Sequence, residues 1–345
     1  MLVPSPFSPG GHAVKSTRML VLLALGSASA LAAPVLTLDA ALKKTPEVAS
    51  VELALQEQQD ARANLNRLLQ DPLATPMEVA QARLRASLAD ARSARAPKAA
   101  RAQIAAAYTS AVTAQAAVPL AQKSVTVAAK GLEIAQIRLK NGSATNQVVR
   151  DAQDRLGDAR KSLSSAQANV RLAEDALRDL VGDFEKLTPV RDLPDPPSAN
   201  VVDGVLKEST TLLQARQGVE SAQLQLSVLD PSYTARKDID AARSGLESAR
   251  KSLTQAQSGE RQNVQNLFDA VTRAWRDVTH ERQAEATARA KLTQDQRRLT
   301  GGLISPFDLM QSELSAQQAA FGVLKAENEY VRSYYALLAG GEGSR

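Results

Sequence analysis

The sequence contains no cysteine among its 345 residues. This excludes disulfide bonds, thiolate ligands for zinc and a lipidated N-terminal cysteine. Aromatic residues are also scarce, at 3% of the chain against 44% hydrophobic residues in total, although aromatic side chains usually supply much of a compact core. Much of the hydrophobic content is alanine, and this composition is typical of long helices and coiled coils.

Histidine is nearly absent, with His12 near the N-terminus and His280 within a helical pattern. A zinc site without cysteine needs several histidine or carboxylate ligands, so we expect no metal. The sequence has neither a Gly-x-Ser-x-Gly motif nor a phosphate-binding glycine loop. We therefore expect no cofactor and no enzymatic activity.

The formal net charge is +5, and it falls to +3 without Lys15 and Arg18. Basic and acidic residues are interleaved, as in Arg236-Lys237-Asp238. Nucleic-acid binding requires clustered positive charge, so this pattern indicates solvated helix faces and no nucleic-acid partner.

The N-terminus has the three parts of a secretory signal peptide. Lys15 and Arg18 precede an apolar run, Met19 to Leu25, and Ala30-Leu31-Ala32 is a suitable cleavage signal. The alternative is a membrane anchor, but the run is too short to span a bilayer of about 30 Å. We expect residues 1–32 to be a signal peptide, the protein to be exported to the periplasm or outer envelope, and no later segment to cross the membrane.

Two segments carry the same heptad pattern. The first runs from Val149 to Leu180 and the second, 160 residues later, from Leu309 to Leu337. In both, core positions are spaced alternately by three and four residues, as in a coiled coil. In the first segment alanines alternate with larger residues, which favours close helix packing: Ala152, Leu156, Ala159, Leu163, Ala166, Val170, Ala173 and Leu177.

A proline-rich segment divides the chain. Residues 183–200 contain four prolines and cannot continue a helix. Comparison of the two halves at an offset of 160 matches Ile104 with Val264 and Arg138 with Arg298. We therefore predict that the signal peptide is followed by a first helical repeat (33–182), a linker (183–200), a second helical repeat (201–340) and a short flexible tail (341–345).

Each repeat is predicted to contain three helical segments before its heptad segment. A first helix covers about 38–69, with Asp39 as a possible cap and a break at Pro46, and its counterpart covers about 202–229. A middle segment and a long helix follow in each repeat: 76–96 and 98–140, then 232–257 and 259–300. Pro119 predicts a kink or break in the first long helix only.

Glycine turns connect the long helices to the heptad segments. They are Asn141-Gly142-Ser143-Ala144-Thr145 and Gly301-Gly302-Leu303-Ile304-Ser305. Glycine is favoured just after a helix, and Thr145 and Ser305 are suitable N-caps. Each repeat should therefore contain a long antiparallel hairpin.

The second heptad segment has a wider apolar face, with further rows that include Phe307, Phe321 and Leu324. A helix with two apolar stripes needs partners on two sides. These partners could be the other hairpin or other subunits, and a self-contained four-helix bundle is the alternative.

These features resemble the TolC-like outer membrane efflux proteins. The resemblance rests on the duplication, on the glycine turns and on short motifs: Leu36-Thr37-Leu38-Asp39-Ala40-Ala41-Leu42, Asp308-Leu309-Met310-Gln311 and Ala336-Leu337-Leu338-Ala339-Gly340. It implies a trimer whose hairpins form a hollow periplasmic cylinder. It also implies that the turns contact a periplasmic adaptor protein through Asn141, Gly142, Ser143, Gly301, Gly302 and Leu303.

The resemblance further implies that acidic residues after the second turn surround the channel entrance. Asp308 matches one such position, whereas Gln311 stands at a neighbouring one. The alternative for Asp308 is an acidic residue favoured by the helix dipole in a first turn.

The middle segments depart from the family, whose members insert membrane strands there. Residues 73–100 contain no aromatic residue and 232–260 contain only Tyr233, although membrane strands need aromatic girdles and an apolar outer face. We therefore predict an all-α fold of two tandem coiled-coil hairpins, TolC-like, without a transmembrane β-barrel.

The sequence leaves three functions open. The first is a transport component, in which the hairpins form or extend a conduit of an efflux or secretion system. The second is a structural coiled-coil spacer of the cell envelope, and the third is an adaptor-type connector. A polar lumen in a trimer favours transport, and a dry closed core favours the spacer.

Overall fold

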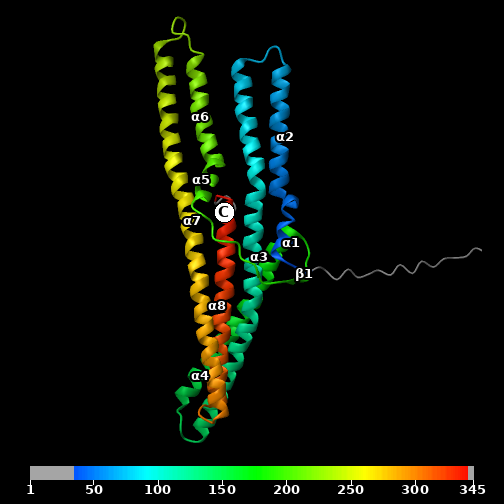
Figure 1. Cartoon of the computed structure of the whole chain (residues 1–345), viewed down its shortest axis with the longest axis vertical. Helices are drawn as coiled ribbons and strands as arrows, with labels where there is room; N and C mark the ends of the chain where they lie inside the picture. Colours follow the sequence, from blue (N-terminus) through cyan, green and yellow to red (C-terminus); the bar gives the residue numbers. More distant parts are fainter. Residues whose placement is uncertain (1–34, 341–345) are drawn as a thin grey trace, which may run out of the picture. The chain divides into compact units, whose positions relative to one another are not determined.

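The computed structural model describes residues 35–340, so the predicted signal peptide and C-terminal tail lie outside the described residues. Helices make up almost all of this part of the chain (Figure 1). In order, the elements are β1 (Val35–Leu36), α1 (Leu38–Leu42), a 3₁₀ turn (Thr45–Glu47), α2 (Ala49–Gln70), α3 (Pro76–Lys140), α4 (Asn146–Val181), β2 (Lys186–Leu187), α5 (Asn200–Lys207), α6 (Thr210–Ser227), α7 (Arg236–Thr300) and α8 (Pro306–Leu338).

The two longest helices, α3 and α7, have 65 residues each and end 160 positions apart. The predicted boundaries between middle segments and long helices are wrong, because each pair forms one continuous helix. Of the kink or break predicted at Pro119, the break is wrong, since α3 continues through both Pro97 and Pro119. An internal proline costs about 3 kcal/mol, and the packing of α3 against α2, α4 and α8 offsets this cost.

The first helix of each repeat is interrupted near its start. The 3₁₀ turn around Pro46 separates α1 from α2, which confirms the predicted break. The cap of α1 is Thr37 and not Asp39, because the Thr37 side chain accepts a hydrogen bond from the Ala40 amide. In the second repeat the interruption falls between α5 and α6, where Ser209 caps α6.

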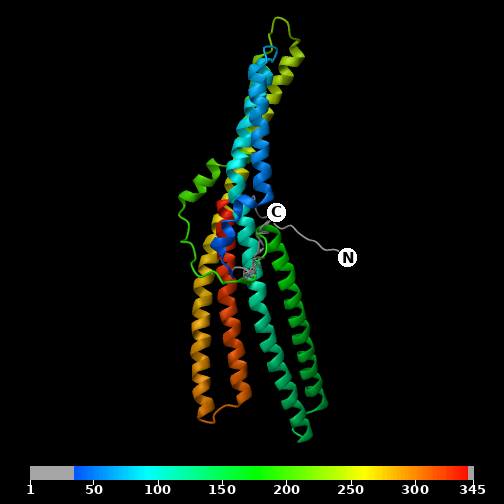
Figure 2. The same cartoon turned by 90° about the vertical axis from the view of Figure 1, so that its right-hand side faces the viewer.

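The hairpins lie side by side in a single row. In the half that contains the glycine turns the order is α4, α3, α8 and α7, because α3 packs on both α4 and α8 while α8 packs on both α3 and α7. Figure 2 shows the four helices of this row side by side. In the other half α2 packs on α3, α6 on α7, and α6 also touches α3 (Figure 1).

The heptad rows lie in the helix seams, as predicted. Leu156, Ala166 and Leu177 are buried on α4, and Tyr330 and Leu337 are fully buried on α8. The additional apolar stripe of α8 contacts the other hairpin, since Phe307 packs on Gly131 of α3 and Leu324 packs against the first core cluster.

The segment predicted as a linker packs into the protein. Phe184 and Leu187 are buried, and β2 pairs in parallel with β1. The Tyr108 hydroxyl is a hydrogen-bond donor shared between the carbonyls of Leu36 (3.0 Å) and Thr188 (2.6 Å). This end of the segment is therefore held to the first repeat by specific contacts.

A second tyrosine holds the other end of the same segment. The hydroxyl of Tyr330 on α8 donates to the Pro194 carbonyl at 2.8 Å, and its ring lies 5.0 Å from that of Trp275 on α7. Burial raises the pKa of Tyr330 to about 12, so the hydroxyl keeps its proton at physiological pH.

Arg95 of α3 connects the repeats from within the protein and is only 4% exposed. Its guanidinium donates to the carbonyls of Glu208, just after α5, and Ala339, just after α8, at 3.0 and 2.9 Å. Helix C-termini carry partial negative charge and unpaired carbonyls, so one cation stabilises two helix ends. Next to it, Gly340 has φ 62°, and an added Cβ there would lie 1.9 Å from Arg95 Nη2.

One described helix, α3, is long and apolar enough over part of its length to cross a membrane. Part of this apolar composition belongs to the core, because Ile104, Tyr108 and Ala111 are completely buried among other helices. The sequence prediction of no later apolar span rested on uninterrupted runs, which α3 does not contain.

We expect Arg95→Ala to lower the free energy of unfolding by about 2–4 kcal/mol, because it leaves two helix-terminal carbonyls without their buried donor. Urea unfolding followed by circular dichroism measures this change. Arg92→Ala is the matched control, since Arg92 is exposed on the preceding turn of α3. Equal stability of the two variants would contradict a clamping role for Arg95.

Candidate functional site

The two glycine turns have the same backbone geometry. In the first, the Gly142 amide bonds to the Leu139 carbonyl and the Ser143 amide to the Arg138 carbonyl. In the second, Gly302 and Leu303 make the equivalent bonds to Leu299 and Arg298. Gly142 and Gly302 have φ values of 71° and 70°, so each turn is a Schellman motif that requires glycine at this position.

The residues predicted to contact an adaptor are all solvent-exposed in the turns. The two turns differ in polarity. Leu303 presents an apolar side chain that is 72% exposed, whereas Ser143 donates its hydroxyl proton to the Arg138 carbonyl. The second turn therefore offers an apolar contact that the first lacks.

Basic side chains surround both turns, a feature that the sequence prediction missed. Arg138 and Lys140 lie in the last turn of α3, and Arg297 and Arg298 lie in the last turn of α7. Cations are favoured at helix C-termini. Because two C-termini lie at the same end of the row, their favoured cations gather at one place.

Asp308 forms a capping box with Ser305 at the start of α8. Its carboxylate accepts from the Ser305 amide at 2.9 Å and hydroxyl at 2.8 Å, and the Asp308 amide donates to the Ser305 hydroxyl at 3.2 Å. These hydrogen bonds lower the pKa of Asp308, with a further contribution from Arg298 and Arg138. The carboxylate therefore stabilises the N-terminus of α8, as expected of an acidic residue in a first turn.

A buried polar pair lies about two helical turns from the second glycine turn. The Ser312 hydroxyl of α8 donates to the carboxylate of Asp295 on α7, and Arg298 donates to the same carboxylate. The pKa of Asp295 is lowered mainly by the hydrogen bond from Ser312. The corresponding positions of the first hairpin are Ala135 and Ala152, so this charged contact distinguishes the second hairpin.

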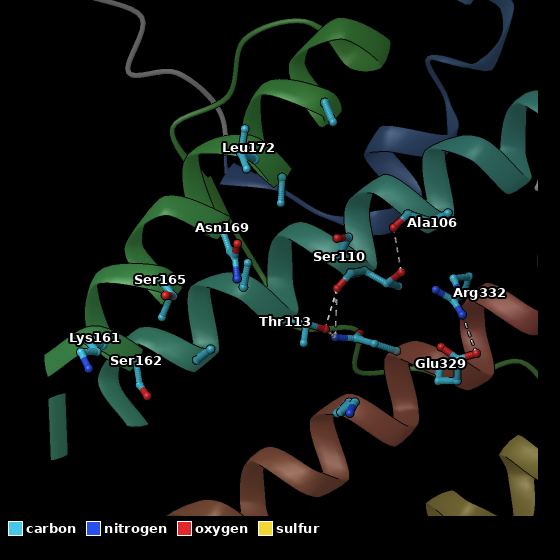
Figure 3. Close-up of a pocket in the computed structure, with 18 residues that line it drawn as sticks. Ala106, Ser110, Thr113, Lys161, Ser162, Ser165, Asn169, Leu172, Glu329 and Arg332 are labelled. Carbon is cyan, nitrogen blue, oxygen red and sulfur yellow. Dashed lines mark hydrogen bonds and ion pairs between the residues drawn. The ribbon is translucent and has the colours of Figure 1, made fainter. Parts of the chain in front are cut away.

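A groove of about 950 Å³ runs along α3 between α4 and α8. Figure 3 shows Ser110 and Thr113 of α3 between Ser165 of α4 and Glu329 of α8. Its lining consists mainly of alanine, serine, threonine and asparagine, with Lys161, Lys325, Glu329 and Arg332 at the rim. A smaller cavity of about 390 Å³ lies nearer the turns, beside Gly131 and Phe307.

The groove depends on small side chains and on one inter-hairpin hydrogen bond. The Asn328 amide donates to the Thr113 hydroxyl at 2.8 Å and holds α8 against α3. Residues 35–340 contain no group of three or more potential metal ligands. The polar lining can bind a ligand or line a passage.

No family model matches the sequence, and no curated protein matches it. Solved structures do. A membrane protein from Pseudomonas aeruginosa has 12% identity and a TM-score of 0.64, covering 88% of this chain and 93% of that one. The outer membrane protein VceC from Vibrio cholerae has 17% identity and a TM-score of 0.62, covering 88% and 96%.

The MtrE outer membrane channel of Neisseria gonorrhoeae is similar at 16% identity and a TM-score of 0.60, covering 89% of this chain and 88% of that one. The chain has the TolC-like fold. The sequence resemblance is confirmed at the level of the fold, including the predicted helical hairpins. At the two places where the resemblance implies inserted membrane strands, this chain has the short loops 71–75 and 228–235, and each loop is followed by a helix.

We expect Ser305→Ala to destabilise the first turn of α8 by about 1 kcal/mol, because it removes one side of the capping box. Hydrogen exchange of the amides of residues 307–309 should accelerate about fivefold. Thr145→Ala is the matched control, because Thr145 makes no side-chain cap bond at the start of α4. Similar acceleration at both helix starts would contradict this assignment.

The same cap should respond to pH through Asp308. Because its folded pKa is lowered, the capping contribution is present above the ordinary aspartate range and is lost as the pH falls through the lowered pKa. Hydrogen exchange between pH 6 and pH 3 should therefore show loss of protection at the start of α8 only at the acidic end. Asp308→Asn should abolish this pH dependence.

Proposed function

We propose that the protein is a component of an efflux or secretion system and that it forms or extends a helical conduit in the periplasm. The observation that carries this proposal is the single row of four helices. In the half that contains the glycine turns, a helix in the middle of the row is covered on two sides, but α4 packs mainly on α3 and α7 mainly on α8. Further copies of the chain can continue the row until it closes into a cylinder.

The surfaces of α4 support this proposal. A self-contained four-helix bundle would cover the side of α4 that points away from α3. Instead, α3 is the main helix against which α4 packs, and Leu172 (69% exposed) and Val148 (44% exposed) line open cavities beside α3. We propose a trimer, as in the TolC-like resemblance, with the polar residues of the helix layer available to line a water-filled passage.

We propose that the two glycine turns are the contact site for a periplasmic adaptor protein or another envelope protein. The exposed Leu303 and the surrounding basic side chains are suited to binding a partner with an apolar position and acidic groups. The protein would be exported to the periplasm and associate with the outer envelope. The helical segments after residues 75 and 235 favour extension of a conduit over a complete outer membrane channel.

Mass measurement of the mature protein, with and without detergent, combined with negative-stain imaging tests the conduit. We expect a trimer with a stain-filled lumen in both conditions. A monomer without a lumen would contradict the conduit and favour the structural coiled-coil spacer. A trimer with a closed, dry centre would likewise contradict the conduit and favour the spacer.

Site-specific photo-crosslinking in cells tests the adaptor contact. A photoreactive residue at Leu303 should crosslink to a periplasmic partner protein, because this side chain is 72% exposed at the proposed contact site. The matched control is Tyr233, which is 91% exposed in the loop before α7. Equal crosslinking of one partner from both positions would contradict a specific role for the turns.

A further inference from the structure

The exposed side of α4 carries a row of aspartates, which we call the acidic row. It comprises Asp151, Asp154, Asp158, Asp175 and Asp179, all exposed. These residues recur at spacings of three and four on the side opposite the seam with α3, so they share one stripe of the helix surface. Lys161 is the one cation in the same stripe of α4. The row is therefore negative near its two ends, where Asp158 also pairs with Lys161 at 3.5 Å and Asp175 with Arg178 at 2.9 Å within the same helix.

The exposed side of α7 carries the opposite charge. Arg273, Arg276, His280 and Arg297 lie on one heptad stripe with neutral residues between them, and all are exposed. We call this the basic row. Within residues 35–340, Arg273, Arg276 and Arg297 form no ion pair, whereas neighbouring arginines such as Arg282 and Arg289 do.

The two rows flank the same face of the helix layer. In antiparallel coiled coils, equivalent heptad positions of the paired helices lie on the same side. Thr113, Ser165 and Arg332 stand at one such position on α3, α4 and α8, and all three line the groove. Asp158 shares this position on α4. Arg273 lies 160 residues after Thr113 and therefore occupies the equivalent heptad position on α7.

From this geometry we infer that the acidic row of one copy binds the basic row of the next copy. The inference rests on the self-association proposed above and names the surfaces that carry it. The partner is a second copy of this chain, because α4 and α7 are the two free edges of the row and their charges are complementary. The two helices meet antiparallel, as α7 and α8 do within one copy.

The charges also agree in register. Rotation about an axis along the helices keeps the glycine turns of all copies level. Asp151 then lies opposite Arg297, and Asp175 lies opposite Arg273. In each pair, the distance of the aspartate from the start of α4 and that of the arginine from the end of α7 differ by two residues. Two residues correspond to about 3 Å along a helix, which an arginine side chain easily spans.

Some charges do not match. Asp179 falls opposite Asp269, whose carboxylate accepts a hydrogen bond from Gln265 at 3.0 Å. Lys161 falls opposite neutral residues. The attraction is therefore concentrated near the turns and near the middle of the protein, and these two places fix the register of the copies.

Exposed ion pairs are weakened by salt, so the self-association should be salt-dependent. Sedimentation velocity of the full mature chain gives its dissociation constant at 50 and 500 mM NaCl. We expect this constant to rise at least about tenfold between the two, since several exposed pairs are screened together. Circular dichroism verifies that helix content is unchanged.

Charge reversal tests the pairing itself. One variant combines Asp151→Lys, Asp154→Lys and Asp175→Lys, and a second combines Arg273→Glu, Arg276→Glu and Arg297→Glu. Each should lose most self-association at 50 mM NaCl, and a chain with all six changes should recover it. The control reverses Arg236, Arg250 and Arg261, which are exposed on α7 beyond the reach of α4, and should associate like the wild type.

The outcomes separate this inference from the conduit proposal. A salt-insensitive trimer that survives both reversals would overturn the paired rows and leave the conduit intact. A monomer in all conditions would overturn both. If both triple variants dissociate and the six-fold variant does not recover, the rows do not bind each other. Where a reversal variant loses helix content, the Asp→Asn and Arg→Gln versions replace it, with a smaller loss expected.

Discussion

The packing of α8 against α3 determines the arrangement of every other helix. It brings together the two hairpins, which are distant in the sequence, through small or polar side chains: Phe307 against Gly131, Asn328 with Thr113, and an ion pair between Lys123 and Glu313. Because α3 and α8 each use two opposite sides, they form the centre of a row. The outer sides of α4 and α7 are then left free, and the proposed function follows from this openness.

The seams and turns of the fold could be predicted from the sequence because they rest on local rules. A spacing of three and four residues identified the faces of α4 and α8, and glycine at a left-handed position identified both turns. The continuity of α3 could not be predicted in this way. Local rules treat Pro97 and Pro119 as breaks, whereas three neighbouring helices stabilise α3 through both. Arg95 likewise resembled one more solvated arginine, since its two carbonyl partners lie more than 100 residues away.

The candidate site was predictable in position and less so in chemistry. The exposed turn residues stand where the glycine pattern placed them, but the role of Asp308 depends on the conformation of Ser305 three residues before it. Asp295 is a stronger case, because an aspartate in a helix rich in charged residues is expected to be solvated. Only the approach of Ser312 shows that it is buried.

The equal length of α3 and α7 fixes the distance between the two ends of the protein. A continuous helix of 65 residues spans about 100 Å, and its length is fixed by its own hydrogen bonds. These two helices set the distance between the glycine turns and the loops at the opposite end, and each copy in an assembly would have the same distance. During evolution, an insertion in α3 or α7 alone would make the two helices end at different heights, unless the other helix gained the same number of residues. Insertions of seven residues would also preserve the seams, so the separation of the two ends can change only in steps of about 10 Å.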